Sequence, residues 1–457
     1  MARTTFQNLL KVAYAAALVA GTVSAIDLDI NNEQSIKDAA ATAAFNTMQH
    51  YNGNKTGEIP GVIPSLWGEG GVLFNLMIQY WYFTGDASYN PAVSQGMYWQ
   101  IGDDDYMPSN WSSQIGNDDQ MAWGLAAMTA AELDYPQDVN QTSWLTLAEG
   151  VFNTQVARWD TSNCGGGLRW QIWPFESGYT QKNAISNGGL FQLSARLARY
   201  THNQTYADWA DKIWDWSASV PLLNNKTWSI ADSTNVDNGC TTQGNNQWTA
   251  NYGPYISGAA YMYNYTNGQN SKWKSGLDGL LNVSFETFFP EKYGGLILSE
   301  ILCEPAEVCN SLEDTYKGTF VSDLALASLV APYISSEVSS RLQASAVGAA
   351  KQCTGGNNQT LCGRRWYSDE WDGTDGREEQ LSATSIFFAN MAGFTGKGVA
   401  TAAAAVDQTT GSAGTNGTST NGTGVPVALN GAGRSSQGQF GVATAGVLAG
   451  LVLLLVL

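Results

Sequence analysis

Two adjacent carboxylates, Asp118 and Asp119, lie in the segment "GNDDQ", directly before the helix-forming run "MAWGLAAMTAAEL". Because neighbouring like charges repel, one of the two should keep its proton to a higher pH than the other. Cleavage of a glycosidic bond uses such a split, since one carboxyl protonates the leaving oxygen while the other attacks or activates water. Asn-Asp-Asp before a helix is also an ordinary N-cap with acids in the first turn. The rest of the chain must decide between these interpretations.

Several glycine-rich and tryptophan-rich segments separate the helical runs. They are "SLWGEGGVLF" (65–74), "CGGGLRWQIW" (164–173), "KNAISNGG" (182–189), "IADSTNVDNGC" (230–240), "NNQWTANYG" (245–253) and "DEWDGTDGREEQLSA" (369–383). Glycine allows a backbone to approach a ligand closely, and polar loops often carry functional sites. We therefore expect these segments to surround the carboxylate pair, although turn formation alone would also explain each of them.

The elements that must position these loops are helices. Leu190, Leu193 and Leu197 share one face of a helical run, and Trp209, Ile213 and Trp216 share a face of the next. Connectors that run from a Tyr through a polar turn to an aromatic residue recur about every 50 to 65 residues, the scale of a helix-pair repeat. They span 82–90, 135–144, 200–209 and 263–273. The pattern predicts an all-α fold, an (α/α)6 toroid of six helical hairpins forming a single catalytic domain over 26–396. An open solenoid is the alternative.

Both ends of the chain have the composition of processed segments. Residues 1–25 combine Arg3 and Lys11 with a short apolar core and the small-residue sequence "VSA", as in a secretory signal peptide. Residues 397–433 form a stalk rich in Gly, Ser, Thr and Asn. The segment 434–457 is a polar spacer followed by an apolar tail, which predicts a removed propeptide and GPI attachment near Asn430. A single C-terminal transmembrane helix is the alternative. We expect the mature protein on the extracellular face of the plasma membrane and in the cell wall.

Glycosylation motifs and cysteines agree with secretion. The ten Asn-x-Ser/Thr motifs are at Asn54, Asn110, Asn140, Asn203, Asn225, Asn264, Asn282, Asn358, Asn416 and Asn421. Six cysteines, an even number, suit an oxidising compartment. Short separations suggest the disulfides Cys303–Cys309 and Cys353–Cys362, which would leave Cys164–Cys240, although six cysteines allow 15 pairings.

Charge and histidine content argue against several classes of function. A net charge of −18, from 22 basic and 40 acidic residues, disfavours nucleic acid as a partner. The two histidines, His50 and His202, lie in no metal-binding or catalytic-triad motif, and no Cys-x-x-Cys spacing occurs. We expect a monomer that holds no metal and no cofactor. The 17 Trp, 20 Tyr and 15 Phe supply flat apolar faces suited to sugars as well as to a core.

Taken together, the segments "GNDDQMAWGLAAMTAAEL", "CGGGLRWQIW", "KNAISNGGLFQLSARLARYT", "QWTANYG", "CEPAEVCN" and "WDGTDGREEQLSA" resemble fungal glycoside hydrolase family 76 over nearly all of 27–396. The resemblance implies an (α/α)6 fold, a retaining mechanism and endo-acting cleavage of α-1,6-mannose backbones in mannan or GPI glycans. By the same resemblance, we expect a GPI-anchored protein that takes part in cell-wall biogenesis. Such a protein could act as a transglycosylase that uses wall glucan as the acceptor.

The resemblance also carries residue roles. By it, Asp118 is the nucleophile and Asp119 the general acid/base. We add Asp232 as a residue that binds sugar hydroxyls. Trp123, Trp170 and Trp248 are candidates for stacking on sugar, and Gln171 and Asn187 for contacting hydroxyls. At position 323 the family resemblance leads us to expect arginine, whereas this chain has Asp323. The difference would affect a sugar subsite or a structural salt bridge rather than the carboxylate pair Asp118 and Asp119.

A second hypothesis from another class is a non-catalytic wall lectin, or a structural wall protein, on the same fold. The two hypotheses differ in the need for the carboxylate pair, since a lectin could lose either aspartate without losing its function. Both aspartates and the flanking loops are present, which favours the enzyme.

Overall fold

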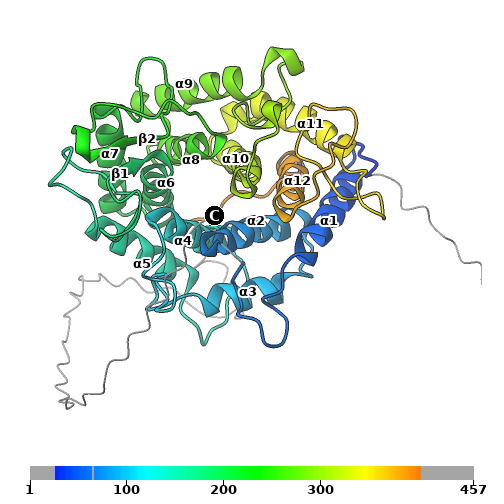
Figure 1. The fold of residues 1–457 in the computed structure, drawn as a ribbon, viewed down its shortest axis with the longest axis horizontal. Helices are drawn as coiled ribbons and strands as arrows, with labels where there is room; N and C mark the ends of the chain where they lie inside the picture. The colour runs from blue at the N-terminus through cyan, green and yellow to red at the C-terminus, as the bar shows by residue number, and fades with distance from the viewer. Residues whose placement is uncertain (1–25, 64–65, 403–457) are drawn as a thin grey trace, which may run out of the picture. The chain divides into compact units, whose positions relative to one another are not determined.

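Twelve α-helices form two concentric rings in the computed structural model, which describes residues 26–63 and 66–402 (Figure 1). The inner ring consists of α2 (Trp67–Thr84), α4 (Asn117–Glu132), α6 (Ala184–Thr201), α8 (Thr249–Tyr265), α10 (Ser311–Val330) and α12 (Arg377–Ala389). The outer helices are α1 (Glu33–Gln49), α3 (Asn90–Trp99), α5 (Trp144–Ala157), α7 (Gln204–Ser219), α9 (Ser271–Phe288) and α11 (Ser335–Gln352). Each inner helix packs on its two inner neighbours, and α12 packs on α2. The ring is therefore closed, which confirms the (α/α)6 toroid and excludes the open solenoid.

Shorter elements lie in the connections. Strands β1 (Gln181–Asn183) and β2 (Ser233–Asn235) pair antiparallel, with Lys182 opposite Thr234. The 3-10 helices are η1 (Val236–Asn238), η2 (Glu291–Tyr293), η3 (Glu304–Ala306), η4 (Pro332–Ile334) and η5 (Asn390–Gly393).

Small residues allow the inner helices to approach closely. At Gly71 of α2, an added Cβ would lie 2.6 Å from the backbone nitrogen of Trp123 in α4. That separation is far below van der Waals contact, so only glycine permits these two helices to pack at this distance. The two predicted apolar faces are confirmed. Leu190, Leu193 and Leu197 are fully buried in the inner helix α6. In the outer helix α7, Ile213 and Trp216 are buried, and Trp209 is partly buried against the core.

The four predicted Tyr-to-aromatic connectors each join an inner helix to the outer helix that follows it. Polar residues in them cap the outer helix. The side chains of Ser143, Asn203 and Asn270 accept hydrogen bonds from the first-turn amides of α5, α7 and α9 respectively. These caps satisfy otherwise unpaired N–H groups at the starts of α5, α7 and α9, whereas α3, with Tyr89 as its N-cap residue, begins without a side-chain cap.

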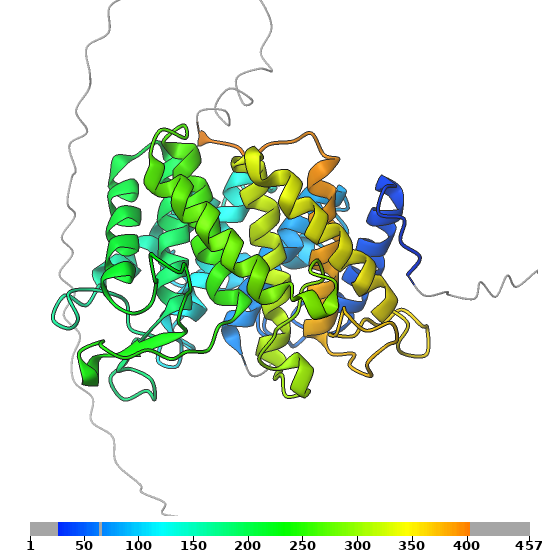
Figure 2. The ribbon, with the colours of Figure 1, turned by 90° about the horizontal axis from the view of Figure 1, so that it is seen from above.

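The end of the described chain forms a strap, residues 396–402, across one end of the toroid (Figure 2). Tyr82 Oη donates to the Gly398 carbonyl (2.9 Å), and Arg199 Nη2 and Nη1 donate to the carbonyls of residues 399 and 400 (2.8 and 2.9 Å). The Ala400 amide donates to the Glu132 carbonyl (3.0 Å). The predicted domain boundary at 396 is therefore too early, because these backbone groups are bonded to the C-terminal ends of inner helices. The predicted signal peptide, Asn416, Asn421, Asn430 and the stalk from 403 lie outside the described residues.

All three disulfides suggested by the sequence are present: Cys164–Cys240, Cys303–Cys309 and Cys353–Cys362. Among the described residues, no single helix has both the length and the apolar character needed to cross a bilayer, and the pair α10–α11, which passes by composition, is bent by 118°.

Seven of the eight described glycosylation motifs have an exposed asparagine: Asn54, Asn110, Asn140, Asn203, Asn225, Asn282 and Asn358. Asn264 is a correction. Its Nδ2 donates to the Val330 carbonyl (2.7 Å), and its Oδ1 accepts from Arg199 Nε (2.9 Å). A glycan on Nδ2 would displace this packed contact between α8 and α10, so the folded protein leaves no room for modification at this residue.

Candidate active site

A cleft of about 300 Å³ opens at the end of the toroid where the inner helices begin. Leu66, Asp118, Trp170, Asp232 and Trp248 all line it, although they come from five separate parts of the chain. The expectation that these loops converge at one end of a ring of hairpins is confirmed. The strap lies at the other end, because it contacts the C-terminal residues of the same helices.

The carboxylate pair occupies the first turn of α4. The Gly116 amide donates to Asp119 Oδ2 (2.8 Å), and the Asp119 amide donates to Asp118 Oδ1 (3.1 Å). Trp170 Nε1 donates to the other oxygen, Asp118 Oδ2 (2.9 Å). The N-cap is Gly116, and Asn117 is already the first residue of the helix. The interpretation of the two aspartates as first-turn acids is confirmed, and both line the cleft.

The loop that carries Trp170 is fixed to the start of α4. The Asn117 amide donates to the Trp170 carbonyl (2.9 Å), and Asn117 Nδ2 donates to the Arg169 carbonyl (2.9 Å). The Trp170 amide donates to the Gln181 carbonyl (2.7 Å), at the first residue of β1. These bonds hold the indole at a set position beside Asp118, which sequence spacing alone could not reveal.

Burial raises the pKa of both carboxyls of the pair, because a low-dielectric setting disfavours the charged form. The negative charge of Asp119 raises the pKa of Asp118 further. The Gly116 hydrogen bond opposes the rise at Asp119 by stabilising its charged form. The pair can therefore hold one shared proton near neutral pH.

Further carboxylates line the cleft, and no lysine or arginine does so among the described residues. Glu69, in the first turn of α2, forms an ion pair with Arg377 of α12. Burial raises the pKa of Glu69 to about 7; Arg377 opposes this, and the nearby Glu378 and Asp119 charges add to it. Glu313 lies in the first turn of α10, where it accepts from the Asn310 amide (2.9 Å). Such a cleft favours neutral or cationic ligands over anions.

Two of the predicted binding residues, Asp232 and Trp248, line the cleft and contact partners that the sequence did not reveal. Asn251 Nδ2 donates to Asp232 Oδ1 (3.1 Å), which fixes that carboxylate at the cleft wall. Trp248 meets Tyr316 edge to face, with ring centroids 5.8 Å apart. Tyr316 and Glu69 were missed, yet both line the cleft. Glu69 lies within the segment "SLWGEGGVLF" that the sequence singled out, whereas no quoted motif contains Tyr316.

Trp123 and Asn187 are corrections. The Trp123 side chain is fully buried among Trp67 and Tyr106, with ring centroids 5.2 and 5.4 Å away, so it has no face for a sugar. Asn187 is also fully buried. Its Oδ1 accepts from the Leu168 amide (2.8 Å) and its Nδ2 donates to the Leu168 carbonyl (3.0 Å). It supports the loop that carries Trp170 rather than contacting a ligand.

Gln171, which we predicted to contact sugar hydroxyls, does not line the cleft. It pairs with Gly116 in an isolated β-bridge, and neighbouring side chains along an extended segment point to opposite faces. Trp170 therefore lines the cleft, while Gln171 lines a separate pocket behind it. Asn183, the N-cap of α6, is the asparagine of "KNAISNGG" that lines the cleft.

A narrower cavity of about 110 Å³ continues from Asp118 along the ring axis to Asp323. Asp323 Oδ1 accepts from Gln192 Nε2 (2.6 Å) and makes no ion pair with Arg196, whose partner is Glu132 (2.7 Å). Burial raises the pKa of Asp323 to about 7; the Gln192 hydrogen bond and the Arg196 charge oppose the rise. The residue is part of the cavity lining, and the structural salt bridge considered for this position is absent.

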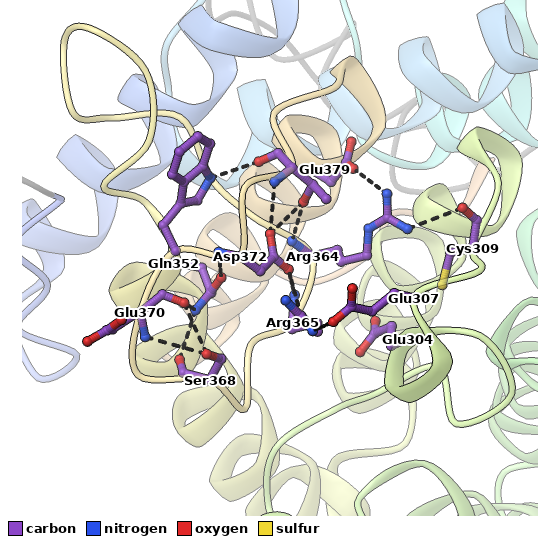
Figure 3. A network of polar contacts seen from close by, with 12 residues as sticks. Glu304, Glu307, Cys309, Gln352, Arg364, Arg365, Ser368, Glu370, Asp372 and Glu379 are labelled. Carbon is purple, nitrogen blue, oxygen red and sulfur yellow. Dashed lines mark hydrogen bonds and ion pairs between the residues drawn. The ribbon is translucent and has the colours of Figure 1, made fainter.

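A polar network braces the loop between α11 and α12 (Figure 3). Asp372 accepts from the amides of Arg365 (2.8 Å) and Thr374 (3.0 Å), which closes the loop on itself. Arg364 donates to the Cys309 carbonyl and to Glu379 Oε1, at 3.2 Å each. The network therefore links the start of α12 to the loop before α10 that the Cys303–Cys309 disulfide closes. Arg377, the ion-pair partner of Glu69, lies at the start of α12.

A helical toroid whose inner-helix N-termini surround a buried pair of adjacent carboxylates is the arrangement of a glycoside hydrolase. Comparison with known proteins agrees, because residues 35–403 match glycosyl hydrolase family 76. The chain belongs to this family, and the resemblance seen in its motifs is confirmed.

Curated fungal relatives match most of the chain. The mannan endo-1,6-alpha-mannosidase DCW1 of Saccharomyces cerevisiae is 40% identical over 368 residues, 79% of this chain and 80% of the relative. The mannan endo-1,6-alpha-mannosidase DFG5 of Candida albicans is 37% identical over 381 residues, 81% of this chain and 83% of the relative.

Solved structures share the fold. Dfg5 from Chaetomium thermophilum, in complex with glucosamine, has a TM-score of 0.78 at 37% identity, covering 82% of this chain and 94% of that one. An inactive variant of a Salegentibacter α-1,6-mannanase, with two consecutive aspartates replaced by asparagine, is bound to α-1,6-mannotriose. It has a TM-score of 0.60 at 17% identity and covers 78% of this chain and 99% of that one, a likeness of fold alone.

Gly68 provides a test of how tightly the pair is positioned. A Cβ at this residue would lie 2.3 Å from Asp119 Oδ1 and 2.9 Å from the Asp119 Cα, so the whole residue would have to move. We expect Gly68→Ala to lower kcat by roughly 10- to 100-fold, the scale of a misplacement of about 1 Å. Stability should fall as well, by about 1–3 kcal/mol, because an added methyl group in a closely packed site strains its neighbours. The kcat is therefore compared well below the melting temperature of both proteins.

The matched control is Gly393→Ala, since no heavy atom lies within 4 Å of the Cβ added there. Its kcat should equal that of the unmodified protein. Equal activity of the Gly68 and Gly393 variants would show that Asp119 tolerates displacement and would contradict this account of the site.

The raised pKa of Asp323 predicts a pH-dependent stability. The folded state holds a proton that the unfolded state releases near pH 4, so the free energy of unfolding should fall as pH rises from about 4 to about 7 and level off above that. Asp323→Asn keeps an oxygen to accept from Gln192 and does not titrate. We expect it to be more stable than the unmodified protein at pH 8, by about 1–2 kcal/mol.

The measurement is urea unfolding at pH 4, 6 and 8. The gain should shrink toward pH 4, and the exposed substitution Asp208→Asn should leave stability within about 0.5 kcal/mol at each pH. A stability gain that is the same at all three pH values would rule out titration as its cause.

Proposed function

We propose that this protein is an endo-acting, retaining hydrolase of α-1,6-mannosidic linkages in mannan or GPI glycans. The observation that carries the proposal is the buried Asp118–Asp119 pair at the start of α4, inside a cleft lined by loops from around the ring. The curated relatives named mannan endo-1,6-alpha-mannosidase support the linkage. The mannotriose complex of a bacterial neighbour with both of its consecutive aspartates replaced supports the role of such a pair.

The cleft chemistry agrees with this substrate. Trp170 and Trp248 offer apolar ring surface, and Asp232 and Asn251 offer hydroxyl partners, as a neutral pyranose requires. Its carboxylates would also favour an amino sugar, and the Chaetomium relative was solved with glucosamine. This supports the GPI glycan as the alternative to mannan. A lectin would have no use for two buried carboxyls with raised pKa values, so we favour the enzyme.

The roles that we propose are Asp118 as nucleophile and Asp119 as general acid/base. Attack by Asp118 on the anomeric carbon requires its charged form, and protonation of the leaving oxygen requires the neutral form of Asp119. The proton that the pair shares must therefore lie on Asp119 at the moment of attack. Asp232, Trp170 and Trp248 are the proposed sugar contacts. The proposal extends to a transglycosylase activity in which a glucan hydroxyl replaces water as the acceptor.

We expect Asp118→Asn and Asp119→Asn each to lower turnover on a defined α-1,6-mannooligosaccharide by roughly 10²- to 10⁴-fold. Both should melt at or above the temperature of the unmodified protein, because a neutral amide replaces a carboxyl with a raised pKa. Products are followed by mass spectrometry, with and without a β-glucan acceptor. Masses of mannosyl-glucan would establish transfer. Near-normal turnover in either variant, at unchanged melting temperature, would refute the catalytic role of that aspartate.

Azide rescue of the alanine variants separates the two roles. With an aryl α-1,6-mannobioside, Asp118→Ala should give a β-configured glycosyl azide, because azide enters in place of the nucleophile. Asp119→Ala should give the α-configured azide, because azide attacks the covalent intermediate. The reverse pattern of anomers would exchange the two assignments.

We also propose that the protein is secreted and held by a GPI lipid attached near Asn430, at the extracellular face of the plasma membrane and in the wall. The support is the sequence pattern of both ends. Phosphatidylinositol-specific phospholipase C should release the mature protein from membranes, and the released protein should lack peptides from 434–457. Retention on membranes after treatment, with those peptides recovered, would instead establish a transmembrane tail.

A further inference from the structure

A second pocket, of about 490 Å³, lies directly behind the catalytic wall. It shares that wall with the cleft, because Asn117 and Gln171 line the pocket while their chain neighbours Asp118 and Trp170 line the cleft. The bridge between Gly116 and Gln171 joins the two segments. The pocket thus lies one chain layer from the reacting groups and is separate from the cleft.

The charge of this pocket is opposite to that of the cleft. Arg158 and Arg169 line it, and Asp160 is its lone acidic lining residue. Asp160 is already shared by Arg169 (2.9 Å) and by the buried Lys182 (3.3 Å). Two arginines and one carboxylate therefore line the pocket, and the carboxylate is also paired with a buried lysine behind it, in a chain whose net charge is −18.

Arg158 has the least compensated of these charges. Its Nε and Nη2 donate to the side-chain oxygens of Asn117 and Gln120, which are uncharged amides. Among the described residues, no carboxylate oxygen lies within 4.0 Å of its guanidinium, and burial lowers its pKa to about 10 although the Asp105 charge opposes this. A half-buried guanidinium with neutral partners favours an anion at its free edge.

The mouth of the pocket adds neutral hydrogen-bond donors. Thr161 and Ser162 are exposed lining residues, and their hydroxyls make no side-chain hydrogen bond within the described chain. Tyr179 lies under the Arg169 guanidinium, 4.3 Å from its ring centroid, and gives the wall a flat apolar face. Guanidinium groups, hydroxyls and a ring face are together suited to a sugar that bears an anionic group.

From this geometry we propose that the pocket formed by Arg158, Arg169, Thr161, Ser162 and Tyr179 binds the phosphoryl group of a phosphorylated sugar. The bidentate donors of arginine match phosphate oxygens. The proposal goes beyond the hydrolase activity and does not depend on it, since no residue of the pocket acts on the glycosidic bond. An anionic substituent that the acidic cleft repels would be held on the other side of the same wall.

The test is calorimetric titration of the full mature protein at low ionic strength with mannose 6-phosphate, mannose, inorganic phosphate and glucuronate. Mannose 6-phosphate should bind at least tenfold more tightly than each of the other three. Ser162→Glu, which puts a negative charge at the exposed mouth, should weaken that binding at least tenfold. The matched control Ser339→Glu, exposed on α11, should leave it unchanged.

Three results would overturn the proposal: equal affinity for mannose and its phosphate, equal affinity for glucuronate, or unchanged affinity in the Ser162→Glu variant. Equal affinity for inorganic phosphate would show that the pocket binds the free ion, and it would overturn the assignment of a phosphorylated sugar as the ligand. The Asp118→Asn variant should bind mannose 6-phosphate as the unmodified protein does. Failure of the pocket and failure of the catalytic proposal are thus distinguishable.

Discussion

The common direction of the six inner helices is the constraint on which this structure depends. Residues at the starts of α2, α4, α6, α8 and α10 line the cleft, and α12 begins beside it, where Arg377 pairs with Glu69. The N-termini of these helices, with partial positive charge, thus lie around one small volume. Glu69, Asp118, Asp119 and Glu313 lie in the first turns of three of these helices. The helix termini lower the cost of gathering these carboxyls, although burial still raises the pKa of Glu69, Asp118 and Asp119.

The same constraint explains why loops carry the site while the helices carry the fold. The inner helices are buried nearly all round and approach one another at positions such as Gly71 and Gly318, where a side chain would collide with the neighbour. Their lateral packing leaves few polar groups free for ligands. The cleft is therefore built from the residues that precede each helix and from its first turn, held by bonds such as Trp170 to Asp118 and by the Cys164–Cys240 disulfide.

Much of this could be predicted from the sequence, and the failures have a common cause. Helical periodicity, the repeated connectors and the adjacent acids are local signals. The structure confirms the helices and connectors and places the two acids in the cleft. Trp123 lies four residues after Asp119, on the same side of α4, yet α2 covers it through a contact 56 residues away in sequence. Asn187 lies one helical turn beyond Asn183, and that turn moves it from the cleft into the core. Tyr316 enters the cleft only because the ring closes. Long-range packing decided each of these positions.

The strap has a consequence for how a ligand enters the cleft. The described chain leaves the toroid at Ala402, at the pole where the inner helices end, and the cleft opens at the opposite pole. A helix of 17 residues such as α8 is about 25 Å long. The strap and the cleft are therefore separated by about the length of an inner helix. No strap residue lines the cleft within the described chain, so a ligand can enter the cleft without displacing the strap.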